Sequence, residues 1–433
     1  MMEEKRKNTM ILYRNLRYQQ LFDDMCSLLK PEEGEARPDA YACASQLIDL
    51  AVTYGFRGNL WHCFLAFCMA NNENAYSTSC EIIGPVGGSL SELARHDFAQ
   101  VRELFSLDIA RLDETENGIW SEMKHYENAL ENSKAFNHRI RDRIVELSVS
   151  LENAESDQEF QDIVTEFYKE FGVGKFGLNK AFHIIMDDEA KQVDIEPITR
   201  VEHIELSDLV GYELQKAKLI ENTEAFIEGR AANNCLLFGD SGTGKSSSIK
   251  AILNQYYDRG LRMIEVYKHQ FRGLSDVLEQ IKDRNYKFII YMDDLSFEEY
   301  ELEYKYLKAI LEGGLGKRPK NVLIYATSNR RHLIREKFSD KRELDDDLHN
   351  NDTVQEKLSL AARFGVTIYY GKPTPKEFFT IVKELRKRYP EITMSDEELC
   401  AEANKWELSH GGVSGRTAQQ FINYIAGKSG ETE

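Results

Sequence analysis

Residues Cys235–Ser248 read CLLFGDSGTGKSSS, an apolar run that leads directly into a glycine-rich loop. Gly239, Gly242 and Gly244 lack Cβ atoms, so the backbone can turn tightly and aim its N–H groups at phosphate oxygens. A helix that begins after this loop adds the positive end of its dipole. A strand before and a helix after distinguish a phosphate-binding P-loop from a glycine-rich turn that matches by chance. The chain is therefore predicted to bind a nucleoside triphosphate.

Two side chains of the loop have separate expected tasks. Lys245 supplies a mobile cation for phosphate oxygens, and the Ser246 hydroxyl is a ligand for Mg²⁺. The segment Asn404–Glu407 lacks the closing aspartate of a guanine-reading NKxD motif, so we expect ATP as the nucleotide. The expected nucleotide-binding loop comprises Gly239, Asp240, Ser241, Gly242, Thr243, Gly244, Lys245, Ser246 and Ser247.

Polar residues follow the next apolar runs. Lys287–Asp294 reads KFIIYMDD, which is how a buried parallel strand delivers carboxylates to the edge of its sheet. We expect Asp293 to hold Mg²⁺ through water, and Asp294 to act as base or orienter for the attacking water. Val322–Ala326 is another such run, followed by Thr327, Ser328 and Asn329, and the Asn329 amide can orient water against the γ-phosphate. The alternatives are a solvated turn for the acids and an ordinary polar strand end for the amide.

Two arginines are further candidates. Arg363 lies at the end of a helical stretch, just before a β-rich run, and Arg416 lies at the start of the last expected helix. A guanidinium offers a fixed fork of donors that matches phosphate oxygens and keeps its charge. Position alone favours a solvated surface role for either residue, because most arginines are exposed.

From residue 195 to 433 the chain resembles the AAA+ ATPases, and more narrowly a bacterial AAA+ family of unknown function. The resemblance is carried, in the family's order, by DLVGYELQKAKLIENTEAFIEGRAANNCLLFGDSGTGKSS, MDDLSFEE, YATSNRRHL, EKLSLAARFGV and GVSGRTAQQF. It implies an α/β fold with a five-stranded parallel sheet and a small helical lid. It also implies that Val210 and Gly211 pack near the adenine, that Asn329 and Arg416 are the first and second sensors, and that Arg363 is an arginine finger acting in a neighbouring subunit.

The sequence departs from the common family pattern at the acidic pair. Many AAA+ ATPases have Asp-Glu where this chain has Asp293-Asp294, and the pair resembles that of helicase loaders and replication initiators, which hydrolyse slowly. Glu298 and Glu299 lie one helical turn further on, so the catalytic base is either Asp294 or one of these glutamates. No aromatic-hydrophobic-glycine pore loop follows the second expected strand of the ATPase core, which disfavours a peptide-threading unfoldase.

The pattern divides the chain into three expected domains. Residues 1–195 show apolar side chains at helical spacing and no catalytic constellation, which predicts a helical domain that binds a client or partner. Residues 196–372 form the ATPase core and residues 373–433 the lid, whose helices open with capping boxes at Thr374 and Ser395. Gly172–Gly177 matches GxGxxG, but a helix precedes it, so Gly172 is interpreted as a helix C-cap.

Composition limits the partners. Lys and Arg total 55 and Asp and Glu total 73, and 55 − 73 gives a net charge of −18, which disfavours nonspecific nucleic-acid binding but leaves it open. The seven cysteines show no CxxC or Cys/His zinc spacing, so we expect reduced thiols in the cytoplasm. No apolar run is long enough for a signal peptide or a membrane span, so no membrane association is expected.

These patterns predict an oligomeric, Mg²⁺-dependent AAA+ ATPase that couples ATP binding and hydrolysis to remodelling or loading of an unknown protein client. Arg363 would act in trans between its subunits. Two alternatives stay open. One is a signalling or assembly switch that binds ATP and turns over rarely, and the other is a nucleic-acid-handling ATPase akin to helicase loaders.

Overall fold

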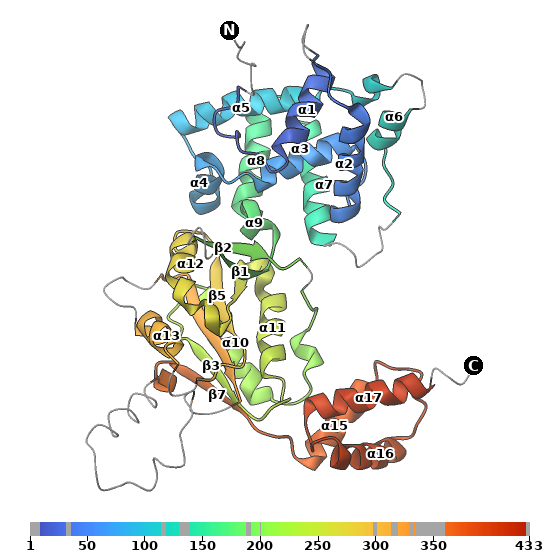
Figure 1. Cartoon of the computed structure of the whole chain (residues 1–433), viewed down its shortest axis with the longest axis vertical. Helices are drawn as coiled ribbons and strands as arrows, with labels where there is room; N and C mark the ends of the chain where they lie inside the picture. The colour runs from blue at the N-terminus through green and yellow to red at the C-terminus, as the bar shows by residue number, and fades with distance from the viewer. Residues whose placement is uncertain are drawn as a thin grey trace. The chain divides into compact units, whose positions relative to one another are not determined.

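The computed structural model describes residues 9–31, 36–113, 118–129, 138–187, 192–199, 201–297, 301–312, 319–329, 333 and 360–429. The chain forms two compact units. The first, here called the helical unit, comprises residues 1–179 and 197–200, and the second, the sheet unit, comprises residues 180–196 and 201–433. Each unit has its own secondary structure, and Figure 1 shows their elements.

Helices form the helical unit, and short polar caps begin several of them. Asn59 and Asn74 accept hydrogen bonds from the first free backbone N–H groups of α3 and α4, and Ser156 does so for α8. Gly172 ends α8 in the left-handed region with φ 76°, so its interpretation as a C-cap is confirmed. The elements are α1 (Gln19–Leu29), α2 (Ala40–Tyr54), α3 (Leu60–Asn71), α4 (Ala75–Ile83), α5 (Ser89–Phe105), η1 (Ile109–Leu112), α6 (Ile119–Lys124), α7 (His138–Glu152), α8 (Asp157–Phe171) and α9 (Gly174–Leu178).

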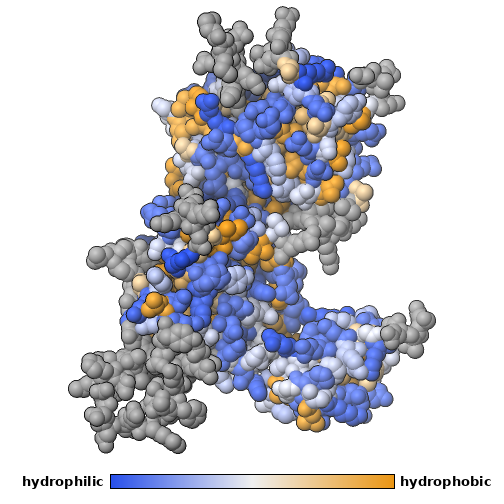
Figure 2. Space-filling view, viewed as in Figure 1, coloured by the Kyte–Doolittle hydropathy of each residue, from blue (hydrophilic) through white to orange (hydrophobic). Residues whose placement is uncertain are grey.

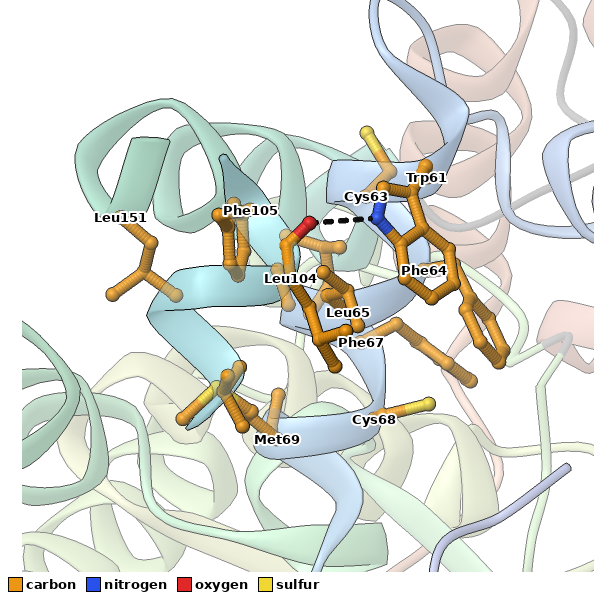
Figure 3. Packing of buried hydrophobic residues seen from close by; sticks show 14 of the residues in the cluster. Trp61, Cys63, Phe64, Leu65, Phe67, Cys68, Met69, Leu104, Phe105 and Leu151 are labelled. Atoms are coloured by element: carbon orange, nitrogen blue, oxygen red, sulfur yellow. Dashed lines mark hydrogen bonds between the residues drawn. The ribbon is translucent and has the colours of Figure 1, made fainter. Parts of the chain in front are cut away.

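Helix α3 lies at the centre of the helical unit. Every residue from Leu60 to Ala70 is buried, so this helix contacts neighbours on all sides rather than along one stripe. Figure 3 shows its Trp61 donating from the indole nitrogen to the Leu104 carbonyl of α5, at 3.0 Å. The aromatic and sulfur-containing side chains of α3 therefore build a core.

A seven-stranded sheet forms the centre of the sheet unit, in the order β2-β1-β4-β5-β6-β3-β7. Its α/β class confirms the prediction, although the expected five strands, β3 to β7, are extended at one edge by β1 and β2. The pairs that join β1, β4, β5, β6, β3 and β7 are parallel. The strands are β1 (Ala181–Asp187), β2 (Gln192–Pro197), β3 (Cys235–Gly239), β4 (Leu261–Glu265), β5 (Lys287–Met292), β6 (Val322–Ser328) and β7 (Val366–Tyr370).

Connection direction places helices on both faces of this sheet. The chain crosses from β3 to β4 in one direction and then returns through β5 to β6, so right-handed crossovers put the intervening helices on opposite faces. Figure 1 shows α11 on one side of the strands and α12 and α13 on the other. The helices of this part are η2 (Leu206–Asp208), α10 (Glu213–Ile227), α11 (Lys245–Tyr256), η3 (Tyr257–Arg259), η4 (Lys268–Gly273), α12 (Leu274–Ile281) and α13 (Glu303–Glu312).

Three helices form a lid at the C-terminal end of the sheet unit: α15 (Pro375–Arg386), α16 (Asp396–Ser409) and α17 (Gly415–Ser429). The predicted capping boxes are confirmed, with Thr374 paired to Glu377 and Ser395 paired to Glu398. The lid has its own small core, which includes Phe378, Leu399 and Phe421. Its surface is mostly hydrophilic on the side seen in Figure 2.

Two further observations concern the chain as a whole. All seven cysteines are free, and burial raises the pKa of the Cys63 thiol to about 11. Within the residues that the structure describes, we find no helix with the length and apolar character needed to cross a membrane.

Candidate functional site

The P-loop connects the end of β3 to the start of α11, as the sequence predicts. Gly239 has φ 134°, and a Cβ there would lie 2.1 Å from the Tyr370 carbonyl oxygen. Gly242 and Gly244 have φ 74° and 89°. All three positions therefore need glycine, because side chains are strained in this region of φ and the first also lacks space. The Asp240 N–H donates to the same Tyr370 carbonyl at 2.9 Å, which ties the loop to β7.

Lys245 lies at the first position of α11 and is 6% exposed. Its Nζ donates to the carbonyls of Gly239 and Asp240 at 3.1 and 2.6 Å, and to Asn329 Oδ1 at 3.0 Å. Burial lowers the pKa of Lys245, while the nearby carboxylates of Asp294, Asp240 and Asp293 act in the opposite direction. The loop thus holds a buried cation at the entrance of α11, where a phosphate would complete its surroundings.

Asp293 follows β5 and joins three elements through hydrogen bonds. Its Oδ1 accepts from Ser246 Oγ at 2.7 Å and from Thr327 Oγ1 at 2.5 Å. Burial alone would raise the pKa of Asp293, but the hydrogen bonds from Thr327 and Ser246 outweigh it and hold the pKa below its usual range. The ionised Asp293 carboxylate and the Ser246 hydroxyl therefore lie together, and both offer oxygen atoms, which are the ligands that a hard cation prefers.

Asp294 adopts a left-handed backbone conformation with φ 48°, one of the few non-glycine residues described that do so. Its N–H donates to Thr327 Oγ1 at 2.9 Å, and its Oδ1 accepts from Asn329 Nδ2 at 2.7 Å. Asn329 therefore connects the Asp294 carboxylate to the Lys245 ammonium through the two ends of one amide. Sparsely populated backbone conformations concentrate at functional sites, because the surroundings must hold them there.

A cavity of about 920 Å³ opens beside this network. One wall is the P-loop from Ser241 to Ser248, with Asp293, Asp294, Thr327 and Asn329. Residues 202–212, Lys216 of α10 and the lid provide the rest. The apolar side chains among them are Ile204, Leu209, Val210, Ile381 and Leu385. The others are Glu202, His203, Asp208, Tyr212, Lys216, Arg388, Tyr389, Gly415, Arg416, Gln419 and Asn423.

The other predicted site residues have distinct positions. Val210 lines the cavity and packs against the lid core, whereas Gly211, with φ 82°, is not among the lining residues. Ser247 lines the cavity beside Ser246. Gly239 and Asp240 are not among the lining residues, and their carbonyls accept hydrogen bonds from Lys245 Nζ.

The two candidate arginines differ. Arg416 lies in the first turn of α17, lines the cavity, and donates from its backbone N–H to the Gly242 carbonyl at 3.2 Å. Arg363 is half-buried just before β7 and does not line the cavity of its own chain. Glu298 and Glu299 lie outside the described residues.

Sequence reasoning assigned no role to Thr327, Asp208 or Arg388. A signal existed for Thr327, because β5 and β6 pair in register with Met292 opposite Ala326. In parallel strands of this register the next residues, Asp293 and Thr327, also lie side by side. Asp208 and Arg388 form an ion pair at 2.8 Å across a long sequence separation, for which no local pattern gives a signal.

The residues present fit a triphosphate with Mg²⁺. A loop with positive-φ glycines, a buried lysine and a helix N-terminus match phosphate, and Ser246 and Asp293 match the metal. Among the described residues, no group of three or more His, Cys, Asp and Glu side chains is placed to hold a metal. Mg²⁺ typically takes one or two protein carboxylates and keeps waters and phosphate oxygens as its other ligands.

Strand order and site together define the class. The five strands lie in the order β4-β5-β6-β3-β7, and the P-loop follows β3, which is the first of them in the chain. Polar residues follow β5 and β6, and a helical lid follows β7. This arrangement is that of an AAA+ ATPase. A family model described as "Protein of unknown function (DUF815)" matches residues 179–429. The chain belongs to this family.

Comparison with solved structures and with curated proteins gives less information about this chain than the family match does. Three RuvB structures from Thermotoga maritima, two of them mutants and one titled a Holliday junction branch migration motor, are 16, 14 and 14% identical to this chain. They cover 53, 52 and 52% of it and 72, 73 and 72% of their own chains, with TM-scores of 0.36, 0.32 and 0.31. At such scores the likeness carries no argument about function. No curated protein matches the sequence.

Proposed function

We propose that this chain hydrolyses ATP with Mg²⁺ and uses the cycle of binding and hydrolysis to remodel or load a protein client. The observation that carries the proposal is the hydrogen-bonded chain from Lys245 through Asn329 to Asp294, beside Asp293 and Ser246. It sets a phosphate-binding cation, a polar amide and a free carboxylate oxygen along one wall of one cavity.

Each side chain has a task in this proposal. Lys245 binds phosphate oxygens, and Ser246 and Asp293 hold the metal, which when bound neutralises charge on the phosphates. Asp294 accepts the proton of the attacking water or orients it, and Asn329 keeps both Asp294 and Lys245 in place. Glu298 and Glu299 are the competing candidates for the base. Arg416 binds phosphate from the lid of its own chain.

Apolar residues that line the cavity support adenine as an expected ligand. They include Leu209, Val210 and Ile381. Gly211, which follows Val210, has the left-handed conformation that lets the chain turn into α10. Apolar walls with a few polar groups are usual for nucleotide pockets.

Assembly and client binding complete the proposal. Arg363 does not line its own cavity, which supports a role on the nucleotide of a neighbouring subunit in a homo-oligomer. The helical unit, which uses its buried polar groups internally, is proposed to bind the client, and exposed apolar residues such as Ile83, 70% exposed, support this. Seven free cysteines support a cytoplasmic setting.

Removing the Lys245 side chain tests the proposal. Lys245→Ala should lose binding of ATP with Mg²⁺ in calorimetric titration while the protein keeps its circular dichroism spectrum, because Lys245 makes polar contacts rather than core contacts. Lys218→Ala, which removes an exposed lysine of α10, is the matched control and should bind as the wild type does. Undiminished ATP affinity in the Lys245 variant would overturn the P-loop assignment.

One observation favours a second candidate function, an assembly switch with little turnover. Asp294 is one methylene shorter than the glutamate common at this position, and Asn329 already occupies one of its carboxylate oxygens. Turnover measured with and without added client separates the two functions, because a remodeller is stimulated by its client and a switch stays slow. Nucleic-acid handling is a third possibility, and salt-dependent DNA binding would favour it.

A further inference from the structure

The lid contacts the rest of the sheet unit at the P-loop and again at residues 202–210. At the P-loop, Arg416 N–H donates to the Gly242 carbonyl, and a Cβ on Gly242 would lie 3.1 Å from the Arg416 Cβ. At the second place, Val210 packs against the lid core and Asp208 pairs with Arg388. Both Asp208 and Arg388 line the cavity that we propose to hold ATP.

The Asp208 carboxylate is oriented by its own segment. Its Oδ2 accepts from the Glu205 N–H at 2.8 Å, within a capping box of the short helix η2. Its Oδ1 forms an ion pair with Arg388 Nη2 at 2.8 Å. The acidic partner is therefore set by residues 205–208 of the chain, and the basic partner comes from the lid, just beyond α15.

The covalent connection to the lid lies elsewhere, at residues 371–374. There the Lys372 N–H donates to Asp240 Oδ2 of the P-loop at 3.0 Å, and the Tyr212 hydroxyl donates to the Gly371 carbonyl at 2.9 Å. These bonds hold the pivot of the lid to the P-loop and to α10. A lid that rotates about this pivot can keep the Asp240 bond, but it must separate Arg388 from Asp208.

We propose that the Asp208–Arg388 ion pair is a latch that keeps the lid closed and thereby slows release of the bound nucleotide. This inference rests on the proposed ATP site. The pairs that Lys383 and Arg386 form with Asp396 do not have this property, because both partners belong to the lid itself. Those pairs stabilise the lid internally and do not join it to the rest of the sheet unit.

The expected change in the dissociation rate of the nucleotide follows from the solvent exposure of the ion pair. The side chains of Arg388 and Asp208 are 46 and 33% exposed, so solvent and salt weaken their attraction. Partly exposed ion pairs contribute little each, which corresponds here to about a 2- to 5-fold change in the dissociation rate. Added salt should speed release from the wild type and have less effect once the pair is broken.

Nucleotide release measured by stopped flow tests the latch, with the fluorescent nucleotide mant-ADP and Mg²⁺ as the probe. Arg388→Ala and Asp208→Asn should release it about 2- to 5-fold faster than the wild type. The exchanged pair Asp208→Arg with Arg388→Asp should restore slow release, which a merely local defect in folding would not. Lys383→Ala, which breaks an exposed pair within the lid, is the matched control and should release at the wild-type rate.

A second measurement does not depend on nucleotide. The Arg416 amide reports lid opening, because its N–H donates from the lid to the Gly242 carbonyl of the P-loop. Its hydrogen exchange in the nucleotide-free protein should be faster in Arg388→Ala and unchanged in Lys383→Ala. If the wild type binds no mant-ADP, the proposed ATP site is wrong, and exchange of the Arg416 amide alone then decides the latch. Wild-type release rates in the single variants, a failure of the exchanged pair, or unchanged exchange of the Arg416 amide would overturn it.

Discussion

The helical unit and the sheet unit both bury polar side chains, but they use them differently. In the helical unit the hydroxyls of Tyr13 and Tyr168 lie 2.9 Å apart, and Tyr168 also donates to the Met69 carbonyl. The buried Asp97 carboxylate accepts from the backbone N–H groups of residues 11–13. These groups satisfy one another inside a core.

In the sheet unit the hydrogen-bonded polar side chains instead face a cavity. Direct hydrogen bonds join Lys245, Asn329 and Asp294, and Thr327 links Asp294 to Asp293. All five residues also line the open space beside the P-loop. A buried polar residue is therefore weak evidence of function by itself. Polar residues that share hydrogen bonds and also face a common cavity are stronger evidence.

Loss of the Arg363 side chain should reduce turnover more than any other single substitution outside the P-loop. Arginine fingers contribute roughly 10³- to 10⁵-fold in rate, or about 4 to 7 kcal/mol of barrier, so Arg363→Ala should abolish turnover while nucleotide affinity survives. If Arg363 acts in trans, mixing this variant with Lys245→Ala should restore some hydrolysis, because a mixed interface pairs an intact P-loop with an intact finger.

Arg416 supplies the control for that mixing experiment. It lines the cavity of its own chain, so Arg416→Ala mixed with Lys245→Ala should not recover, because no single chain then carries both residues. Normal hydrolysis by Arg363→Ala, or activity per subunit that stays flat while the protein remains a monomer, would contradict the shared site and favour a monomeric switch.

Trp61→Ala tests the core of the helical unit. Trp61 is fully buried in α3, so its truncation should lower the free energy of unfolding of the helical unit by about 3 to 5 kcal/mol. Chemical denaturation followed by circular dichroism measures this, and Tyr41→Ala, at a residue 69% exposed, should change stability by less than about 0.5 kcal/mol. The folded variant should still bind ATP. Loss of ATP binding before unfolding would show that the core of the helical unit and the nucleotide site depend on each other.

Asp294→Asn should reduce turnover by roughly 10²-fold, or about 2.7 kcal/mol, with ATP affinity within a few-fold of the wild type. Asparagine adopts the left-handed conformation at least as readily as aspartate, so the backbone should be preserved and the loss attributed to the charge. Steady-state hydrolysis and nucleotide titration give the two values. Retained turnover would move the catalytic role to Glu298 or Glu299.

The P-loop was predictable because its residues are contiguous in sequence. Gly239, Gly242 and Lys245 carry their chemistry within one loop, and the order of strand, loop and helix gives its context. Asp293 and Asn329 were predictable for a different reason, because parallel strands that end in polar residues bring them to the same edge of a sheet. Both inferences need only local pattern and one rule of topology.

The remaining features depend on contacts that no local pattern encodes. β1 is a short apolar run, and such a run does not distinguish strand from helix until it pairs, here with β4. The bond between Asn329 and Asp294 and the ion pair between Asp208 and Arg388 arise from side-chain directions in the folded chain. Sequence reasoning therefore found most residues of the first wall of the cavity, but it missed Thr327 in that wall and the contacts that fix the orientation of the others.

Thr327→Val is expected to have a smaller effect than the substitutions of Arg363, Trp61 and Asp294, and a more specific one. It keeps the shape of the side chain but removes a hydroxyl that donates to Asp293 and accepts from the Asp294 N–H. A hydrogen bond to a charged group contributes about 2 kcal/mol, so turnover should fall by roughly 10- to 30-fold. Thr327→Ser keeps the hydroxyl and should remain close to the wild type.

The pH profile of Thr327→Val shows whether that hydroxyl acts through Asp293. In the wild type, burial raises the pKa of Asp293, but the hydrogen bonds from Thr327 and Ser246 lower it below its usual range. Removing one of them should raise this pKa. Since only the ionised carboxylate binds Mg²⁺, activity is present above the pKa and lost as the pH falls, so the acidic limb should move to higher pH in the variant. An acidic limb that does not move, despite lower turnover, would mean that Thr327 acts on the Asp294 backbone alone, and that Asp293 is kept ionised mainly by Ser246.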